Sequence, residues 1–260
     1  MIQKLLLSVA FDELDEAIPV AEREGIGIEV TLYDTAWLMS ESALQDAGRM
    51  GALLAGRGIP ATTHGPLYDL NPGSLDPTVR DYTKLCYLRG VEVARALGAD
   101  KIVYHTAYNP LLPDGVLKGW KSLATPVWKS VLKAAARDGI QVCLENSYEP
   151  SVEFFKDLFD TFGDGTTAMC FDPAHVHLYS RDGQSAWMVR MGHQVTHIHL
   201  NDNAGKSDDH LALGEGNIPY RSFLKEVCDI CGESTVVLEM RLERALQSIE
   251  YLREIDLWPR

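Results

Sequence analysis

Five side chains suited to binding metal ions lie close together in the second half of the sequence. They occur in the segments FDPAHVHLY and HIHLNDNAGKSDDHLALGEG, and they are Asp172, His175, His199, Asp208 and His210. Carboxylate oxygens and imidazole nitrogens are common protein ligands of divalent zinc and manganese. Asp172 and His175 are three residues apart, and Asp208 and His210 are two apart. Each spacing allows both side chains to reach one ion, so these segments predict a metal site.

Four further metal-capable side chains each stand at the end of a short strand-like run. They are His64, His105, Glu145 and Glu239. A carboxylate that follows an apolar strand lies at low dielectric, where it needs a nearby cation or a proton. Simpler roles stay open: an ion pair with Arg241 for Glu239, a helix cap for Asp172, and hydrogen-bonded core positions for the histidines.

Strand-like and helix-like runs alternate along the whole sequence. Predicted strands are Lys4 to Val9, Ile26 to Thr31, Pro60 to His64, Lys101 to His105, Gln141 to Glu145, Met169 to Asp172, Val195 to Leu200 and Thr235 to Glu239. Helical periodicity predicts helices over Leu14 to Glu24, Ser42 to Gly56, Thr78 to Leu97, Lys118 to Asp138, Val152 to Phe162, Gly183 to Met191, Tyr220 to Cys231 and Leu242 to Ile255. Alternating β/α pairs with apolar strands favour a closed parallel barrel, and no G-x-G-x-x-G follows the first strand. We therefore predict an α/β fold, a (β/α)₈ TIM barrel with a parallel eight-stranded sheet, as one domain over residues 1–260.

In such a barrel the functional groups lie at the carboxyl ends of the strands, where the βα loops begin. All nine metal-capable residues fall there, so we expect them to meet at one rim. His197 and His199 share a face of their strand, and His199 is the better ligand because it is nearer the loop. His197 is predicted to be a packed histidine that supports a ligand.

Composition narrows the classes of partner. The 260-residue chain has a formal net charge of −13 and no run of Lys or Arg, which makes nucleic acid an unfavoured partner. Its first apolar stretch soon meets Asp12 and Glu13, and no apolar run approaches the roughly 20 residues of a membrane span. We expect a cytoplasmic protein with reduced cysteines and no membrane partner. Cys228 and Cys231 are interpreted as structural because no second pair completes a zinc site.

The sequence resembles the superfamily of xylose-isomerase-like barrels, which includes sugar isomerases, sugar epimerases and endonuclease IV. The resemblance covers nearly the whole chain. Its most specific parts are the strings HGPLYDLNPGS, LENS, FDPAH, HIHLNDN, DDHLALGEGNI and LEM. Membership implies the same barrel fold and a metal-dependent enzyme.

Ketose epimerases of this superfamily hold one divalent ion, and the matching positions here are Glu145, Asp172, His199 and Glu239. The resemblance implies that Glu145 and Glu239 pass a proton through an enediolate, with His175 contacting a substrate oxygen. One departure concerns the substrate: Gly205 and Lys206 stand where ketose epimerases usually carry an arginine.

Endonuclease IV, an apurinic-site endonuclease, holds three zinc ions, and each of its nine ligands has a match here. These are His64, His105, Glu145, Asp172, His175, His199, Asp208, His210 and Glu239. The segment TLYDTAWL lacks the basic and polar residues with which endonuclease IV enters a duplex. Leu67 and Tyr68 are interpreted as a pocket wall rather than a wedge.

The sequence therefore predicts a metal-dependent isomerase or epimerase of a sugar, sugar phosphate or related polyol. The alternatives are an endonuclease IV-like zinc phosphodiesterase and a non-catalytic barrel that binds metal or sugar. The expected cofactors are one to three zinc or manganese ions per chain. Assembly of the chain into a homo-oligomer is left open.

Overall fold

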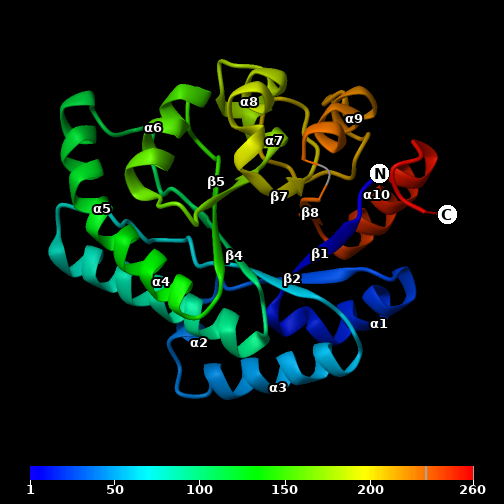
Figure 1. The fold of residues 1–260 in the computed structure, drawn as a ribbon, viewed down its shortest axis with the longest axis horizontal. Coiled ribbons are helices and arrows are strands. Elements are labelled where there is room, and N and C mark those ends of the chain that lie inside the picture. Colours follow the sequence, from blue (N-terminus) through cyan, green and yellow to red (C-terminus); the bar gives the residue numbers. More distant parts are fainter. Residues whose placement is uncertain (232, 260) are drawn as a thin grey trace.

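The architecture is a closed barrel of eight parallel strands with helices around it (Figure 1). The computed structural model describes residues 1–231 and 233–259. Each strand pairs with the next along the chain, and β8 pairs with β1 to close the sheet. The strands are β1 (Lys4–Ala10), β2 (Gly27–Thr31), β3 (Ala61–His64), β4 (Lys101–His105), β5 (Gln141–Glu145), β6 (Ala168–Phe171), β7 (Val195–Leu200) and β8 (Thr235–Leu238). The predicted TIM barrel is confirmed.

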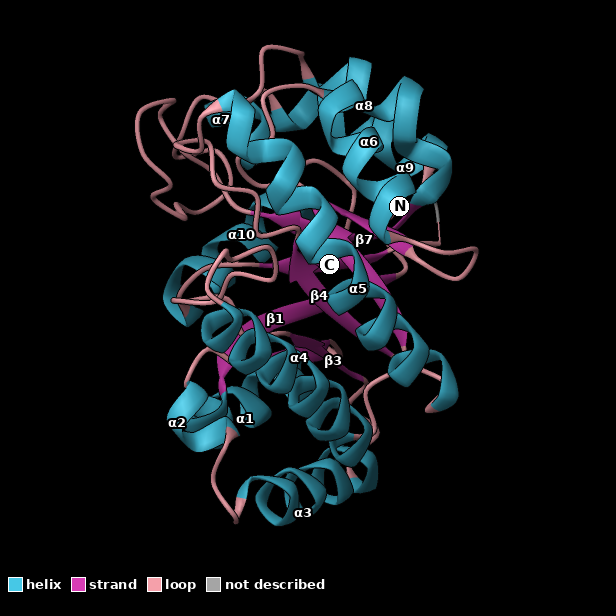
Figure 2. Cartoon of the chain, turned by 90° about the vertical axis from the view of Figure 1, so that its left-hand side faces the viewer, coloured by secondary structure: helices cyan, strands magenta, loops and turns pink. Residues whose placement is uncertain are grey.

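Helices surround the strands, which occupy the centre of the molecule (Figure 2). They are α1 (Leu14–Glu24), α2 (Thr35–Leu38), α3 (Ala43–Gly56), α4 (Pro77–Leu97), α5 (Asp114–Arg137), α6 (Val152–Phe162), α7 (Pro173–Tyr179), α8 (Gln184–Met191), α9 (Tyr220–Ile230) and α10 (Leu242–Glu254), with the 3₁₀ turns η1 (Phe11–Glu13) and η2 (Gly192–Gln194). All eight predicted helices are present. The largest boundary difference is at α5, which begins four residues before the predicted start at Lys118.

Two short helices, α2 and α7, were not predicted because each is shorter than the window in which helical periodicity can be recognised. Each begins after an aspartate that caps it. Asp34 accepts hydrogen bonds from the backbone nitrogens of Ala36 and Trp37 at 2.9 and 3.0 Å. Asp172 caps α7, whose first residue is Pro173, a favourable residue at that position. Both caps give defined conformations to segments that follow strands β2 and β6.

Helix α4 is bounded by local signals at both of its ends, and strand β4 follows it. Asp76 accepts a hydrogen bond from the backbone nitrogen of Thr78 at 2.8 Å and so caps the start of the helix. Gly98 ends it with φ 75°, a left-handed conformation that glycine adopts without steric cost. Strand β4 then begins at Lys101.

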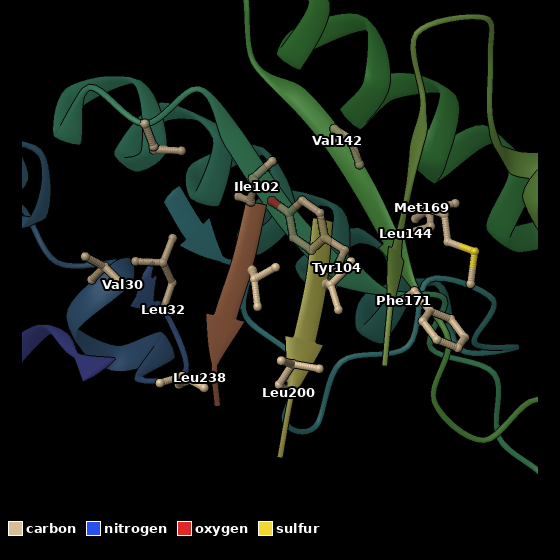
Figure 3. Packing of buried hydrophobic residues seen from close by; sticks show 14 of the residues in the cluster. Val30, Leu32, Ile102, Tyr104, Val142, Leu144, Met169, Phe171, Leu200 and Leu238 are labelled. Carbon is tan, nitrogen blue, oxygen red and sulfur yellow. The ribbon is translucent and has the colours of Figure 1, made fainter. Parts of the chain in front are cut away.

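Side chains on the strands alternate between two environments. One set packs against the helices in the large hydrophobic core, as Figure 3 shows for Ile102, Leu144 and Phe171. The other set faces the barrel interior and includes a small separate cluster of Val103, Cys143, Ala168 and Cys170. Two residues beyond Val103 and Cys143, on the same side of their strands, come His105 and Glu145. The alternation of side chains along the strands therefore places the polar His105 and Glu145 next to an apolar layer of the barrel interior.

The first strand and the last helix of the chain, β1 and α10, lie side by side in Figure 1. The backbone nitrogen of Ile2 donates to the carbonyl oxygen of Leu257 at 3.0 Å. This bond joins the segment that follows α10 to the residues just before β1. None of the described helices has the length and apolar character that a membrane span requires.

Candidate metal centre

Glu145, the last residue of β5, lies at the middle of the cluster and is fully buried. Four imidazoles surround its carboxylate. Its Oε2 atom is 3.1 Å from His64 Nε2 and 3.3 Å from His105 Nε2. Its Oε1 atom is 3.2 Å from His199 Nδ1 and 3.3 Å from His175 Nδ1. Each oxygen of Glu145 thus faces its own pair of histidines.

The nine sequence-predicted residues meet at the same barrel end, and we group them into three adjoining ligand sets, of which the first two have all their ligand atoms within 4.8 Å of one another. In the first, one atom each of Glu145, Asp172, His199 and Glu239 lies within 4.8 Å of the others. The second set consists of His64, His105 and Glu145, within the same limit. In the third, Asp208 Oδ2 is 3.3 Å from His175 Nε2 and 3.4 Å from His210 Nε2. Glu145 belongs to the first two sets and lies 3.3 Å from Nδ1 of His175, a member of the third, so the three sets are contiguous.

Asp172 combines two of the roles that its position suggested. Its Oδ1 atom accepts hydrogen bonds from the backbone nitrogens of Ala174 and His175 at 2.6 and 2.8 Å, and so caps α7. Its Oδ2 atom accepts one from Asn201 Nδ2 at 3.0 Å. Asn146 holds the backbone of Asp172 through two hydrogen bonds, of 2.8 and 2.9 Å. One oxygen therefore organises the helix, while the other remains available to a ligand set.

A divalent cation fits the residues present, because buried polar atoms of the centre lack hydrogen-bond partners. Among the described residues these atoms include Glu145 Oε1, Glu239 Oε2 and His199 Nδ1. The nitrogen and oxygen atoms approach each other closely but are not aligned for hydrogen bonds. Buried polar atoms are costly without a partner. A cation would satisfy these oxygen and nitrogen atoms together.

Electrostatics favour positive charge at the centre. Burial would raise the pKa of Glu145, but His199 and His105 outweigh burial and hold this pKa well below its usual range. Burial also opposes ionisation of Glu239, yet His199 lowers its pKa to about 2. Burial dominates at Asp172 and raises its pKa to about 6. Ionised carboxylates among imidazoles make a centre whose charge a cation can balance in place of protons.

Glu29 is a buried residue of this region that the sequence reasoning missed. It lies in β2 with no exposed surface. Its Oε2 atom is 2.8 Å from His197 Nε2, and its Oε1 atom is 2.9 Å from His199 Nε2. The signal in the sequence was a single acid inside the apolar run GIGIEVTL. His197 is buried beside it, as expected for a packed histidine that supports a ligand.

Glu149, in the loop after β5, is a second buried acid that was missed. It accepts hydrogen bonds from Thr106 Oγ1 and, at 2.6 Å, from the backbone nitrogen of Ser147. Burial raises the pKa of Glu149. Its partners come from the loops after β4 and β5, so it joins the two loops that follow His105 and Glu145.

A cavity of about 740 Å³ opens above the ligand sets. Glu239 lines it together with Leu67 and Tyr68, which are wall residues as predicted. Glu13 and Glu16 also line it and add negative charge. Glu145 lies deeper, in contact with the lining residues His105 and His175. The two glutamates of the first ligand set therefore differ in their access to the cavity.

Two of the simpler readings can be compared with the observed contacts. Among the described residues, the ion-pair partner of Glu239 is His199, whose Nδ1 is 3.1 Å from Glu239 Oε2. Arg241, which the sequence offered as a partner for Glu239, lines the cavity. Cys228 and Cys231 are free thiols at the end of α9, and the ligand sets found among the described residues do not include them.

The fold and the centre define a TIM barrel whose metal-capable side chains gather at one end. The chain belongs to the family of xylose isomerase-like TIM barrels, whose model matches residues 27–255. An uncharacterized protein of Methanocaldococcus jannaschii, MJ1311, is 27% identical over 208 residues, which are 75% of this chain and 70% of that protein.

Solved structures share the same architecture. The TTHB071 protein from Thermus thermophilus, from a crystal soaked with ZnCl₂, has a TM-score of 0.81 and 29% identity. The match covers 97% of this chain and 98% of that one. A D-tagatose 3-epimerase-like protein has a TM-score of 0.84 and 22% identity, with 97% of each chain covered. At 22% identity, the likeness to the D-tagatose 3-epimerase-like protein shows a shared fold.

Proposed function

We propose that the protein is a metal-dependent enzyme that isomerises or epimerises a small sugar or related polyol. The observation that carries this proposal is the first ligand set, with Glu145, Asp172, His199 and Glu239 gathered beneath a cavity of about 740 Å³. That volume suits a small ligand, because pockets for such molecules run from about 300 to 1,000 Å³. The likeness to an epimerase-like structure supports the same class.

Glu145, Asp172, His199 and Glu239 are the residues that would hold the ion of this enzyme. When bound, a divalent ion supplies Lewis-acid polarisation of a substrate carbonyl. Glu239 lines the cavity, and its carboxylate takes the proton from the carbon beside that carbonyl, which leaves an enediolate. In an epimerisation, Glu145 would have to enter the step protonated; it would give that proton to the opposite face and end ionised, while Glu239 ends protonated, and exchange with solvent would restore both carboxyl groups. His175 also lines the cavity and contacts a substrate oxygen.

The charges around the cavity favour a neutral polyhydroxylated substrate over a polyanion. Glu13, Glu16, Asp208 and Glu239 line the cavity and outnumber Arg241, which also lines it, and the chain carries a formal net charge of −13. Phosphate-rich ligands need a positive surface for most of their affinity. Hydroxyl groups can donate hydrogen bonds to these carboxylates instead.

The experiment is exchange of carbon-bound hydrogen with solvent deuterium, measured by NMR or mass spectrometry across a panel of ketoses with the metal-loaded protein. We expect deuterium at a carbon next to the carbonyl. Glu239→Gln should slow the exchange by about 100-fold or more, since general acid–base groups contribute 10² to 10⁴ in rate. Glu250→Gln is the matched control, because Glu250 is exposed and pairs with Arg253 on α10. Absence of exchange with every ketose would reject the isomerase.

A multinuclear zinc phosphodiesterase is the second candidate, and a specific observation favours it. A single-ion enzyme needs the first ligand set alone, whereas His64, His105, His175, Asp208 and His210 complete two more sets. Three zinc ions held in this way would supply Lewis-acid chemistry for hydrolysis of a phosphodiester. The acidic cavity wall argues against a nucleic-acid substrate.

Metal counting and a nicking assay separate the two candidates. About one ion per purified chain supports the isomerase, and about three zinc ions support the hydrolase. Efficient cleavage of a duplex with an abasic site would replace the first proposal by the second. A protein that binds metal but shows neither deuterium exchange with a ketose nor cleavage of the duplex would be a non-catalytic barrel.

A further inference from the structure

We propose that Glu29 is a positioning residue of the metal centre, one that fixes the ring of His199 so that Nδ1 is the nitrogen offered to the ion. The inference rests on the proposed metal centre and does not depend on which reaction occurs there. Glu29 is fully buried in β2. It is outside the ligand sets found among the described residues and does not line the cavity above them.

The two nitrogens of His199 face different groups. Nδ1 is 3.1 Å from Glu239 Oε2 and 3.2 Å from Glu145 Oε1, so it points into the first ligand set. Nε2 is 2.9 Å from Glu29 Oε1. A neutral imidazole carries one N–H and one lone pair. The negative charge of a carboxylate 2.9 Å away favours the proton on Nε2, although the two atoms are not aligned for a hydrogen bond, and this leaves the lone pair of Nδ1 for an ion.

The orientation of the Glu29 carboxylate is itself fixed. Its Oε2 atom accepts a hydrogen bond from Thr62 Oγ1 at 2.9 Å and lies 2.8 Å from His197 Nε2. Both partners hold Oε2, so Oε1 is directed at His199. Thr62 belongs to β3, next to β2, whereas His197 and His199 belong to β7. Glu29 therefore reaches across the barrel interior from β2 to a strand with which β2 does not pair.

The environment of Glu29 also argues for a dedicated role. Burying a carboxylate is costly, and a hydrophobic residue would fill a barrel interior at lower cost. The interior layer includes the apolar side chains of Val103 and Cys143, which shows that this region accommodates such residues. The burial of a charge beside two histidines is explained if the charge orders His199.

The test compares Glu29→Leu, Glu29→Gln and Thr63→Val by their affinity for Co²⁺ and Zn²⁺ without any substrate. We expect Glu29→Leu to weaken metal binding about 10- to 100-fold, the usual effect of losing a residue that supports a ligand. Glu29→Gln keeps an acceptor oxygen and should recover most of that loss. Thr63→Val is the control on strand β3, which also carries Thr62: it loses only the hydrogen bond from Thr63 Oγ1 to the backbone oxygen of Lys101, 3.4 Å away, so it should bind within a few-fold of wild type.

Two spectroscopic measurements separate positioning from general structural damage. The visible spectrum of the Co²⁺ protein reports ligand geometry and should change in Glu29→Leu but not in Thr63→Val. In the Zn²⁺ protein, the imidazole ¹⁵N shifts should show the proton of His199 on Nε2 in wild type and its loss from that nitrogen in Glu29→Leu. If Glu29→Leu does not fold, Glu29→Ala takes its place against Thr63→Val, and the same loss of the His199 proton from Nε2 is expected.

Unchanged affinity and an unchanged His199 proton in Glu29→Leu, or in Glu29→Ala if it takes the place of Glu29→Leu, would overturn the inference. So would a wild-type protein that binds neither ion. Loss of one whole ion per chain, rather than of affinity, would mean that the inner group of Cys170, His197 and His199 is itself a metal site, and would also overturn it. Failure of the sugar reaction appears separately, as absent deuterium exchange with normal metal binding.

Discussion

The charge of Glu145 is balanced by imidazoles rather than by lysine or arginine. A histidine can change its charge near neutral pH, so the balance depends on pH. His64 shows the effect: burial lowers its pKa, but the hydrogen bond and charge of Glu145 outweigh burial and raise it. Metal ions bind neutral imidazole, so an ion that enters the centre replaces protons. The same side chains can therefore bind either protons or a metal cation.

His210 should make the stability of the metal-free protein depend on pH. Burial opposes its charge, but the hydrogen bond with Asp208 prevails and raises the pKa of His210 to about 9. Because the pKa of His210 is higher in the folded state than its unfolded value of 6.5, its full contribution to stability is present at pH values below 6.5. That stabilisation is lost as pH rises through about 9. The free energy of unfolding, measured with urea and a chelator, should therefore fall between pH 6 and 9.5.

His210→Gln is the comparison for this prediction, because glutamine keeps a polar side chain without the titration. Its free energy of unfolding should change less over the same pH interval. An equal change in both proteins would assign the pH dependence to other groups and contradict the role of the Asp208 pair.

Sequence reasoning found the side chains that end strands, since a barrel brings strand ends to one rim. Glu145 and His199 were predictable in this way. Glu29 was not, because an acid in mid-strand has no partner that the sequence identifies. Its contact with His199 exists only after the barrel closes and sets β2 opposite β7. Residues that act across the interior need the tertiary structure.

At the scale of elements, the long amphipathic helices were predicted more reliably than the short ones. A helix such as α6 shows its apolar stripe over several turns and has the predicted bounds. α7 has seven residues and is defined by a cap on Asp172 and a proline. That cap also orients a metal-capable side chain, so an element too short to predict contributes directly to the centre.

The packing of α3 against α4 allows a prediction with an internal control. A Cβ atom at Gly51 would lie 2.7 Å from the backbone of Ala96 and Leu97, whereas at Gly48, in the same helix, it would meet open space. Gly48→Ala should stabilise the protein by up to about 1 kcal/mol, because alanine is the better helix former. Gly51→Ala should destabilise it despite that gain, because backbone must shift. Denaturant unfolding measures both, and equal effects would contradict this description of the interface.

At the scale of the whole molecule, closure of the barrel assembles residues that are distant in the sequence. His64 and Glu239 belong to strands or loops far apart in the chain, yet one atom of each lies with His199 within 4.8 Å. The strand ends and their order were predictable. The grouping into three adjoining sets was not, because it depends on which side chain faces which across the rim.

Metal binding should therefore stabilise the entire fold, because the ligand sets join strands β3 to β8. A ligand that binds only the folded state adds about 2.7 kcal/mol to the free energy of unfolding at 100 times its dissociation constant. We expect urea unfolding with Zn²⁺ to show this gain over unfolding with a chelator. Glu145→Gln should lose most of it, since Glu145 belongs to two ligand sets. Glu250→Gln, at an exposed site on α10, should keep it. Equal stability of the wild-type protein with Zn²⁺ and with chelator would mean that the gathered carboxylates and imidazoles do not form a metal centre, and the cost of burying them would then need another explanation.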